Sequence, residues 1–242
     1  LVVASTATAT ISDEASTDIG ATVLSAIGAK TSGAVTATNA IDISGSSAEV
    51  TAALVTADTL VVASTATVTI TGNPSITDLN AIAAKTSGVV TTTLAADSLS
   101  NLGALSTAGT DAITITVNDA DAAALTASNL STLGGKTAGT VTVTNAVAIT
   151  GSASELTAAL VTAGSLVEVS DATATINDAD GTGITAAALS AIGGATTGTV
   201  TVTNAIAITG SPSEVTAALV TAGSLVDVTD ATVTITGNPT IT

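Results

Sequence analysis

The chain has 242 residues, and 46% of them are apolar although Phe, Tyr, Trp, Met and Cys are all absent. Its core must therefore consist of aliphatic side chains, which suit a thin core between closely spaced backbones better than a wide globular interior. The absence of Cys and His excludes disulfides, thiolate metal sites and the usual general base. The net charge of −16 repels phosphate, so we expect no nucleic-acid partner, and it attracts cations.

The sequence repeats itself. An ungapped alignment of residues 1–77 on residues 166–242 gives 50 identical positions out of 77. This offset of 165 residues defines a super-repeat of six shorter repeats, so we expect one continuous array over residues 1–242. The nine repeats, numbered 1 to 9 in chain order and 22 to 33 residues long when complete, begin at Leu1, Ala34, Leu60, Val89, Asp111, Thr140, Leu166, Thr199 and Leu225. The sequence ends within repeat 9, so we expect it to be part of a longer chain or filament.

Each repeat begins with two short stretches of alternating polarity, which predict half-buried strands. In repeat 8, Val200 and Val202 are expected to point inward, a corner follows at residues 204–205, and Ile206 and Ile208 resume the inward face. Outward positions then read Ala205, Ala207 and Thr209 in repeat 8 but Thr232, Thr234 and Thr236 in repeat 9. Threonine arrays therefore alternate between faces from repeat to repeat.

A capping box follows the second strand. Ser211 at the N-cap, Pro212 at the first helical position and Glu214 at the third predict the start of a helix, and the same box recurs at residues 46–49 and 152–155. Val215, Ala218, Leu219 and Ala222 then fall at helical spacing, and Gly223 is expected to close the turn. The segment VTAAL is also compatible with a third strand.

Such a unit cannot bury its apolar side alone, whereas stacked copies share one core. The pattern predicts a mainly β fold, a repeat β-solenoid of about nine repeats with two strands and a short helical or irregular third side in each.

Acidic loops follow the strands in some repeats, at residues 13–14, 118–121 and 177–181. Clustered oxygen ligands in a turn suit calcium, and stacking is expected to bring an acid of the intervening repeat close to two such loops. The candidate calcium ligands are Asp119, Asp121, Glu155, Asp178 and Asp180. The alternative is that these residues cap helices and solvate turns.

Three further patterns bear on function. The Thr-x-Thr strands suggest ice binding, but threonine also has a high propensity for exposed strand positions. Lys30, Lys85 and Lys136 share one position after the predicted helix, where a cation complements the helix dipole. No apolar run reaches 18 residues, so we expect no transmembrane helix.

The segments TVTVTNAIAITGS, ATATINDADG and SEVTAAL resemble the repeat regions of very large bacterial secreted and cell-surface proteins, including those of marine cyanobacteria, which are described as haemolysin-like or adhesin-like. The resemblance covers the whole chain and is one of composition and period. It implies an extracellular or cell-surface stalk, fibre or coat, often dependent on calcium. The GGxGxDxLx nonapeptides of calcium β-rolls are absent.

These observations favour a structural filament or stalk protein without catalysis, whose partner is itself through end-to-end or lateral assembly. Exposed strand edges at the ends of a stack favour such addition. The alternatives are an adhesin or binding module, dependent on calcium or directed at glycan or ice, which requires one flat face with the same side chain in every repeat, and an enzyme, which requires a polar cleft that interrupts the repeat.

Overall fold

The computed structural model describes residues 5–165, 167–224 and 226–237. The chain forms two compact units. Unit 1 comprises Leu1–Ala95, Ala104–Ile115 and Lys136–Gly139, and unit 2 comprises Ala96–Gly103, Thr116–Gly135 and Thr140–Thr242.

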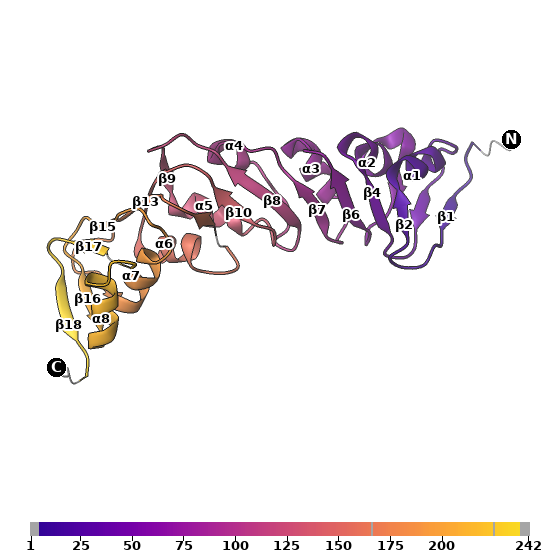
Figure 1. The fold of residues 1–242 in the computed structure, drawn as a ribbon. Coiled ribbons are helices and arrows are strands. Elements are labelled where there is room, and N and C mark those ends of the chain that lie inside the picture. The colour runs from indigo at the N-terminus through magenta and orange to yellow at the C-terminus, as the bar shows by residue number, and fades with distance from the viewer. Residues whose placement is uncertain (1–4, 166, 225, 238–242) are drawn as a thin grey trace. The chain divides into compact units, whose positions relative to one another are not determined.

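Unit 1 combines parallel strands with stacked helices (Figure 1). One sheet has the order β1-β3-β5, formed by β1 (Ala9–Ile11), β3 (Val35–Ala37) and β5 (Val61–Val62). The other contains β2 (Asp18–Gly20), β4 (Asp42–Ser46), β6 (Thr67–Thr71), β7 (Val90–Thr93) and the start of β8 (Ala112–Val117). Beside them, α2 (Ser47–Leu54) packs between α1 (Ala21–Gly28) and α3 (Ile76–Ala83), and a 3-10 turn, η1, spans Ala57–Thr59.

Unit 2 follows the same plan. In one sheet, β10 (Val141–Val143) pairs with β12 (Glu168–Val169). A second sheet has the strand order β9-β11-β13-β15-β17, and a third has the order β14-β16-β18, all with parallel pairing. The remaining strands are β9 (Ala124–Thr126), β11 (Ala148–Gly151), β13 (Thr173–Ile176), β14 (Gly183–Thr185), β15 (Val200–Val202), β16 (Ala207–Gly210), β17 (Val226–Val228) and β18 (Thr232–Ile235). Each helix packs on the next in the series α4 (Leu99–Leu102), α5 (Ala127–Gly134), α6 (Ala153–Leu160), α7 (Ala186–Gly193) and α8 (Pro212–Leu219).

The fold is α/β, with alternating strand and helix segments and parallel sheets, so the expected mainly β fold and β-solenoid architecture are wrong. Helix and strand account for 27% and 28% of the described residues. The third side of repeats 1 to 8 is a helix of its own, with one turn in α4 and two turns in the others, whose apolar side packs on the neighbouring helix and the strands. A serine or threonine side chain caps the start of each of these helices except α1, which favours a helix at these positions. The reading of VTAAL as a strand is also wrong, since residues 215–219 lie in α8.

The predicted strand faces of repeat 8 are confirmed. Val200, Val202, Ile206 and Ile208 are all at most 2% exposed, and the corner at residues 204–205 separates β15 from β16. In repeat 9, Thr232, Thr234 and Thr236 are exposed, but so are Val233 and Ile235 between them. Burial therefore follows period-two alternation in repeat 8 but not in β18.

Strand pairing between the sheets changes where the length of a repeat changes. Repeat 4 is short and contributes one strand, so β6, the second strand of repeat 3, pairs with β7, the first strand of repeat 4. Repeat 7 is long and contributes three strands: β12 pairs with β10, β13 lies between β11 and β15, and β14 pairs with β16. A sheet therefore ends, and another begins, inside the array.

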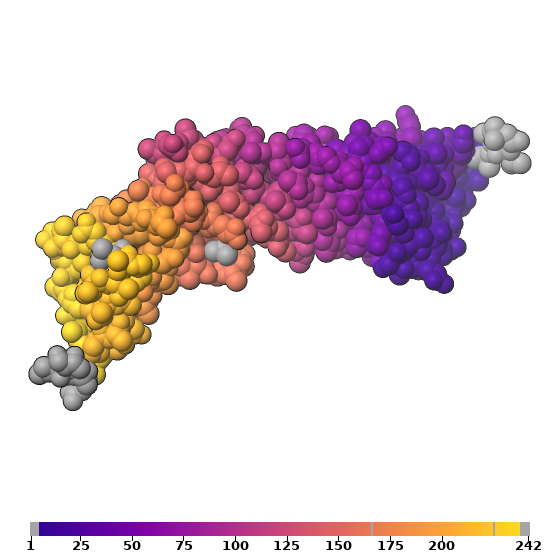
Figure 2. Space-filling view, in the orientation of Figure 1, coloured from indigo at the N-terminus to yellow at the C-terminus, as the bar shows by residue number. Residues whose placement is uncertain are grey.

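The core is aliphatic, as the composition requires. Fully buried side chains include Leu24, Ile43 and Leu79 in unit 1 and Leu130, Ile149 and Leu156 in unit 2. Within each unit, successive repeats form adjoining bands of colour on the surface (Figure 2). Burial is thus shared between neighbouring repeats, as in other repeat proteins.

Candidate calcium ligands and the junctions between repeats

The acidic loops of repeats 5 and 7 each place one carboxylate on the helix of the preceding repeat. Asp119 accepts a hydrogen bond of 2.7 Å from the N–H of Leu99, the first residue of α4. Likewise, Asp178 accepts a hydrogen bond of 2.7 Å from the N–H of Ala153, the first residue of α6. The first N–H groups of a helix lack partners within the helix and lie at the positive end of its dipole. Both aspartates therefore act as helix caps across a junction between repeats.

The second aspartate of each loop binds the following repeat. Asp180 accepts a hydrogen bond of 2.9 Å from the N–H of Ala205, whose own carbonyl oxygen accepts a hydrogen bond of 2.7 Å from the N–H of Gly181. Repeats 5 and 6 make the same pair of bonds, of 3.1 Å from Ala146 to Asp121 and 2.8 Å from Ala122 to Ala146. The loop and the corner of the following repeat therefore each donate one hydrogen bond to the other.

An asparagine at the corner completes each of these junctions. Its side-chain amide donates a hydrogen bond of 2.7 Å to the backbone oxygen of the first loop aspartate in the preceding repeat. The pairs are Asn39 with Asp13, Asn145 with Asp119, and Asn204 with Asp178. The recurring Asn-Ala corner is therefore a junction element as well as a turn.

Glu155 belongs to a capping box, as do Glu49 and Glu214, which confirms all three predicted boxes. The Glu155 carboxylate accepts hydrogen bonds from the Ser152 backbone N–H at 2.8 Å and from the Ser152 hydroxyl at 3.0 Å. These bonds, the backbone bond foremost, hold the pKa of Glu155 below its ordinary value. Asp178 caps the same helix, so α6 begins beside two carboxylates.

Stacking thus brings Glu155 and Asp178 to one helix N-terminus. Asp119 and Asp121 share one loop and Asp178 and Asp180 another, and in each loop the two carboxylates bond different repeats. In the described part of the chain, no group of three or more acidic side chains is arranged to hold a metal ion. The carboxylates of all five residues accept hydrogen bonds from protein groups. Calcium binding remains a prediction, and helix capping is the role that the hydrogen bonds show.

Sequence reasoning missed another recurring element, a Thr-x-Gly motif that joins the end of repeats 1, 3, 5 and 7 to the first strand region of the same repeat. In repeat 7, the Thr196 hydroxyl donates to the Ala172 carbonyl at 2.6 Å and accepts from the Gly198 N–H at 3.1 Å. A Cβ on Gly198 would lie 2.2 Å from the same carbonyl oxygen, so only glycine fits. The equivalent pairs are Thr31 with Gly33, Thr86 with Gly88, and Thr137 with Gly139. The repeated letters TSG, TAG and TTG were the available signal.

The lysines lie where the sequence predicts. Lys30, Lys85 and Lys136 directly follow the C-cap residues of α1, α3 and α5. At this position an ammonium group complements the negative end of the helix dipole.

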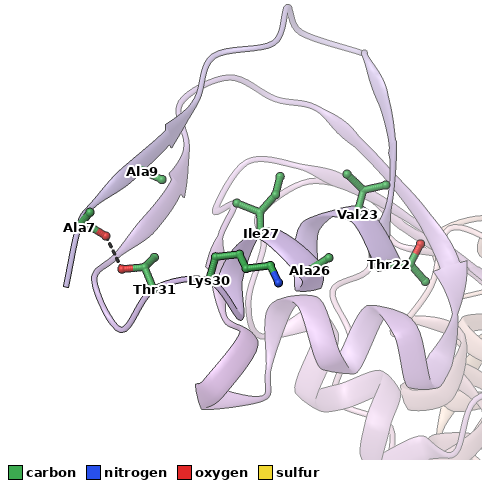
Figure 3. A pocket seen from close by; sticks show the side chains of 8 residues that line it. All are labelled: Ala7, Ala9, Thr22, Val23, Ala26, Ile27, Lys30 and Thr31. Carbon is green, nitrogen blue, oxygen red and sulfur yellow. Dashed lines mark hydrogen bonds between the residues drawn. The ribbon is translucent and has the colours of Figure 1, made fainter. Parts of the chain in front are cut away.

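An apolar groove lies on the outer side of α1 (Figure 3). Val23, Ala26 and Ile27 of α1 line it together with Ala7 and Ala9, around a volume of about 610 Å³. Val23 is 53% exposed. Large exposed aliphatic side chains on one face indicate a contact surface rather than a solvated one.

Neither a family model, nor a curated protein, nor a solved structure matches the chain. No helix within the described residues is both long and apolar enough to span a membrane. The predicted resemblance to bacterial cell-surface repeats therefore stays a prediction.

Proposed function

We propose that this protein is a structural spacer, a segment of an extracellular or cell-surface filament or stalk that carries out no catalysis. The observation that carries the proposal is that one set of bonds recurs at the junctions of repeats 1 with 2, 5 with 6, and 7 with 8. The junction is specified by a few side chains, so length is gained by adding repeats.

The polar side chains of the loops, the corners and the Thr-x-Gly motifs support the same conclusion. The loop aspartates cap helices or bind corners, the corner asparagines bind loops, and the Thr-x-Gly threonines bind backbone carbonyls. Side chains committed to backbone groups within and between repeats in this way serve assembly, whereas a catalytic site needs polar groups that converge on a substrate.

Length scaling tests the proposal. Electron microscopy would compare the chain with a variant in which the 165-residue super-repeat, residues 1–165, occurs twice. We expect the particle to lengthen by a constant increment for each added super-repeat, in calcium and in chelator alike. An unchanged length, or a compact particle whose volume alone grows, contradicts the spacer function. If the particle lengthens only with calcium, the prediction that the acidic loops bind calcium would be supported instead.

A threonine row supports a second candidate, a binding module for ice or glycan. Thr126, Thr150, Thr175 and Thr201 are in register on β9, β11, β13 and β15, at a strand spacing of about 4.8 Å. The expected alternation of threonine arrays between faces is therefore wrong for these strands. The Thr126 hydroxyl caps α5, however, so part of the row is already engaged. Replacement of Thr175 by lysine should abolish ice recrystallisation inhibition or glycan retention if this candidate is correct.

A further inference from the structure

The outer face of α1 is more exposed than the equivalent face of α7, although repeat 7 is a copy of repeat 1 in sequence. Ile27 is half-buried, whereas its equivalent, Ile192, is fully buried. The groove of Figure 3 therefore lies on a helix face whose equivalent in α7 is covered by protein.

In the interior, the covering element is the helix of the preceding repeat, because α6 packs on α7. Ala188, the equivalent of Val23, faces Thr157 and Ala158 of α6 across a groove of about 540 Å³. That groove leaves room for the larger valine side chain. A helix like α6 can therefore cover α1 as it covers α7.

Asp13 points to the same partner independently. It occupies the loop position of Asp178, and its backbone oxygen accepts the Asn39 amide just as that of Asp178 accepts the Asn204 amide. Asp178 uses its carboxylate to cap Ala153 in the preceding repeat. Among the described residues, the Asp13 carboxylate makes no such bond.

We propose that the α1 face is the docking surface for a repeat like residues 140–165, which lies ahead of repeat 1 in the same polypeptide. Its helix covers Val23 and Ile27 and donates its first N–H to Asp13. The proposal rests on the proposed spacer function, and it adds which kind of repeat precedes repeat 1 in the array. A second copy that docked through α8 could not make the bond, because Pro212 at the start of α8 has no N–H.

The test is an extended chain, in which a duplicate of residues 140–165 directly precedes Leu1. We expect the added segment to resist protease as the interior does, and the chain to unfold at a higher denaturant concentration. Asp13→Ala should raise the unfolding equilibrium constant of the extended chain about fivefold, as for loss of a helix cap, and that of the original chain less than twofold.

The control is the same extension with proline in place of its copied Ala153, which removes the N–H and should abolish the effect of Asp13→Ala. Rapid digestion of the added segment, or an equal effect of Asp13→Ala in both chains, overturns the proposal. So does dimerisation of the original chain with protection of α1, which would make a second copy the occupant. The tandem chain of the length test also joins residues 140–165 to a second copy of α1, so Asp13→Ala is the experiment that separates the two proposals. A tandem chain that lengthens, together with an equal effect of Asp13→Ala in the original and extended chains, refutes this docking and leaves the spacer function standing.

Discussion

Two adjacent glycines at the end of α5 lie in different surroundings, which makes them a matched pair for mutation. A Cβ on Gly134 would lie 2.2 Å from the carbonyl oxygen of Ser165, whereas a Cβ on Gly135 has its nearest neighbour at 3.5 Å. We expect Gly134→Ala to cost about 1–3 kcal/mol of unfolding free energy, because the two backbones must move apart. Gly135→Ala should be neutral or slightly stabilising. Urea unfolding of the two variants measures both, and equal effects would contradict close backbone contact at this junction.

The loop position with left-handed backbone gives a second prediction. Ala122 has φ 58° and its equivalent, Gly181, has φ 75°, with no atom within 4 Å of a Cβ at the glycine. Ala122→Gly should stabilise the fold and Gly181→Ala destabilise it, each by about 1 kcal/mol, because an L side chain is disfavoured in this region. Thermal unfolding of the two variants should show shifts of opposite sign. Shifts of the same sign would mean that loop contacts outweigh the backbone conformation.

Residue-scale features were predictable where the cause is local. The boxes at Ser152 and Ser211 depend on residues three positions apart, and the inward direction of Val200 and Val202 depends on alternation alone. The partner of Asp178 is Ala153, 25 residues earlier, and neither local sequence indicates the stacking register that brings the two residues together. Sequence reasoning therefore offered helix capping as one role of this residue but could not identify the helix.

At the scale of the single helix, Asp178 stabilises an element that belongs to another repeat. Asp178→Ala should destabilise the fold by about 1 kcal/mol, because the first N–H of α6 loses its acceptor. The effect should appear in faster hydrogen exchange of the Ala153 amide rather than in the loop that carries Asp178. Asp171→Ala is the control, because the Asp171 carboxylate bonds only the neighbouring Ser170 hydroxyl among the described residues. Equal effects of the two substitutions would contradict the cap.

The capping boxes make helix stability dependent on acid. Hydrogen bonds from the N-cap serine, the backbone N–H first and the hydroxyl second, lower the pKa of Glu49, Glu155 and Glu214. A lowered pKa in the folded state contributes stability that is complete at neutral pH and is lost as the pH falls through the lowered values. Urea unfolding between pH 7 and strongly acidic pH should show this loss. A variant with Gln at all three positions should show a shallower acid dependence, and an unchanged slope would refute the assignment.

Element type was harder to predict than element position. The boundaries near Ser46, Ser152 and Ser211 were recognised, but the abundance of Thr and Val suggested that strands dominate the fold. The helices take a similar share because the small and aliphatic side chains of α5, α6 and α7 are buried where these helices pack on one another, which is a tertiary effect. Composition alone therefore assigned the wrong fold class to correctly placed segments.

At the scale of the whole array, sequence-equivalent helices differ in burial. In α6, Ala153, Leu156, Ala159 and Leu160 are buried, whereas in α8 only Ala218 is buried among the described helix residues. Amides of α8 should therefore exchange about tenfold faster than those of α6, because opening of α8 exposes less buried surface. Exchange followed by mass spectrometry compares the two helices in one sample. Equal protection would show that α8 is stabilised by a contact outside the chain.

Near-identical repeats pose a hazard during folding, because a strand can join its sheet one repeat too early or too late. Repeat 7 opposes this error through its three strands, which pair with β10, with β11 and β15, and with β16. If repeat 8 docked directly on repeat 6, Asn204 would meet no acidic loop and the first N–H of α6 would lose Asp178. Such unpaired backbone groups are costly when buried. Unequal repeats thus serve as an error check, through which the order of repeats along the chain becomes their order in the stack.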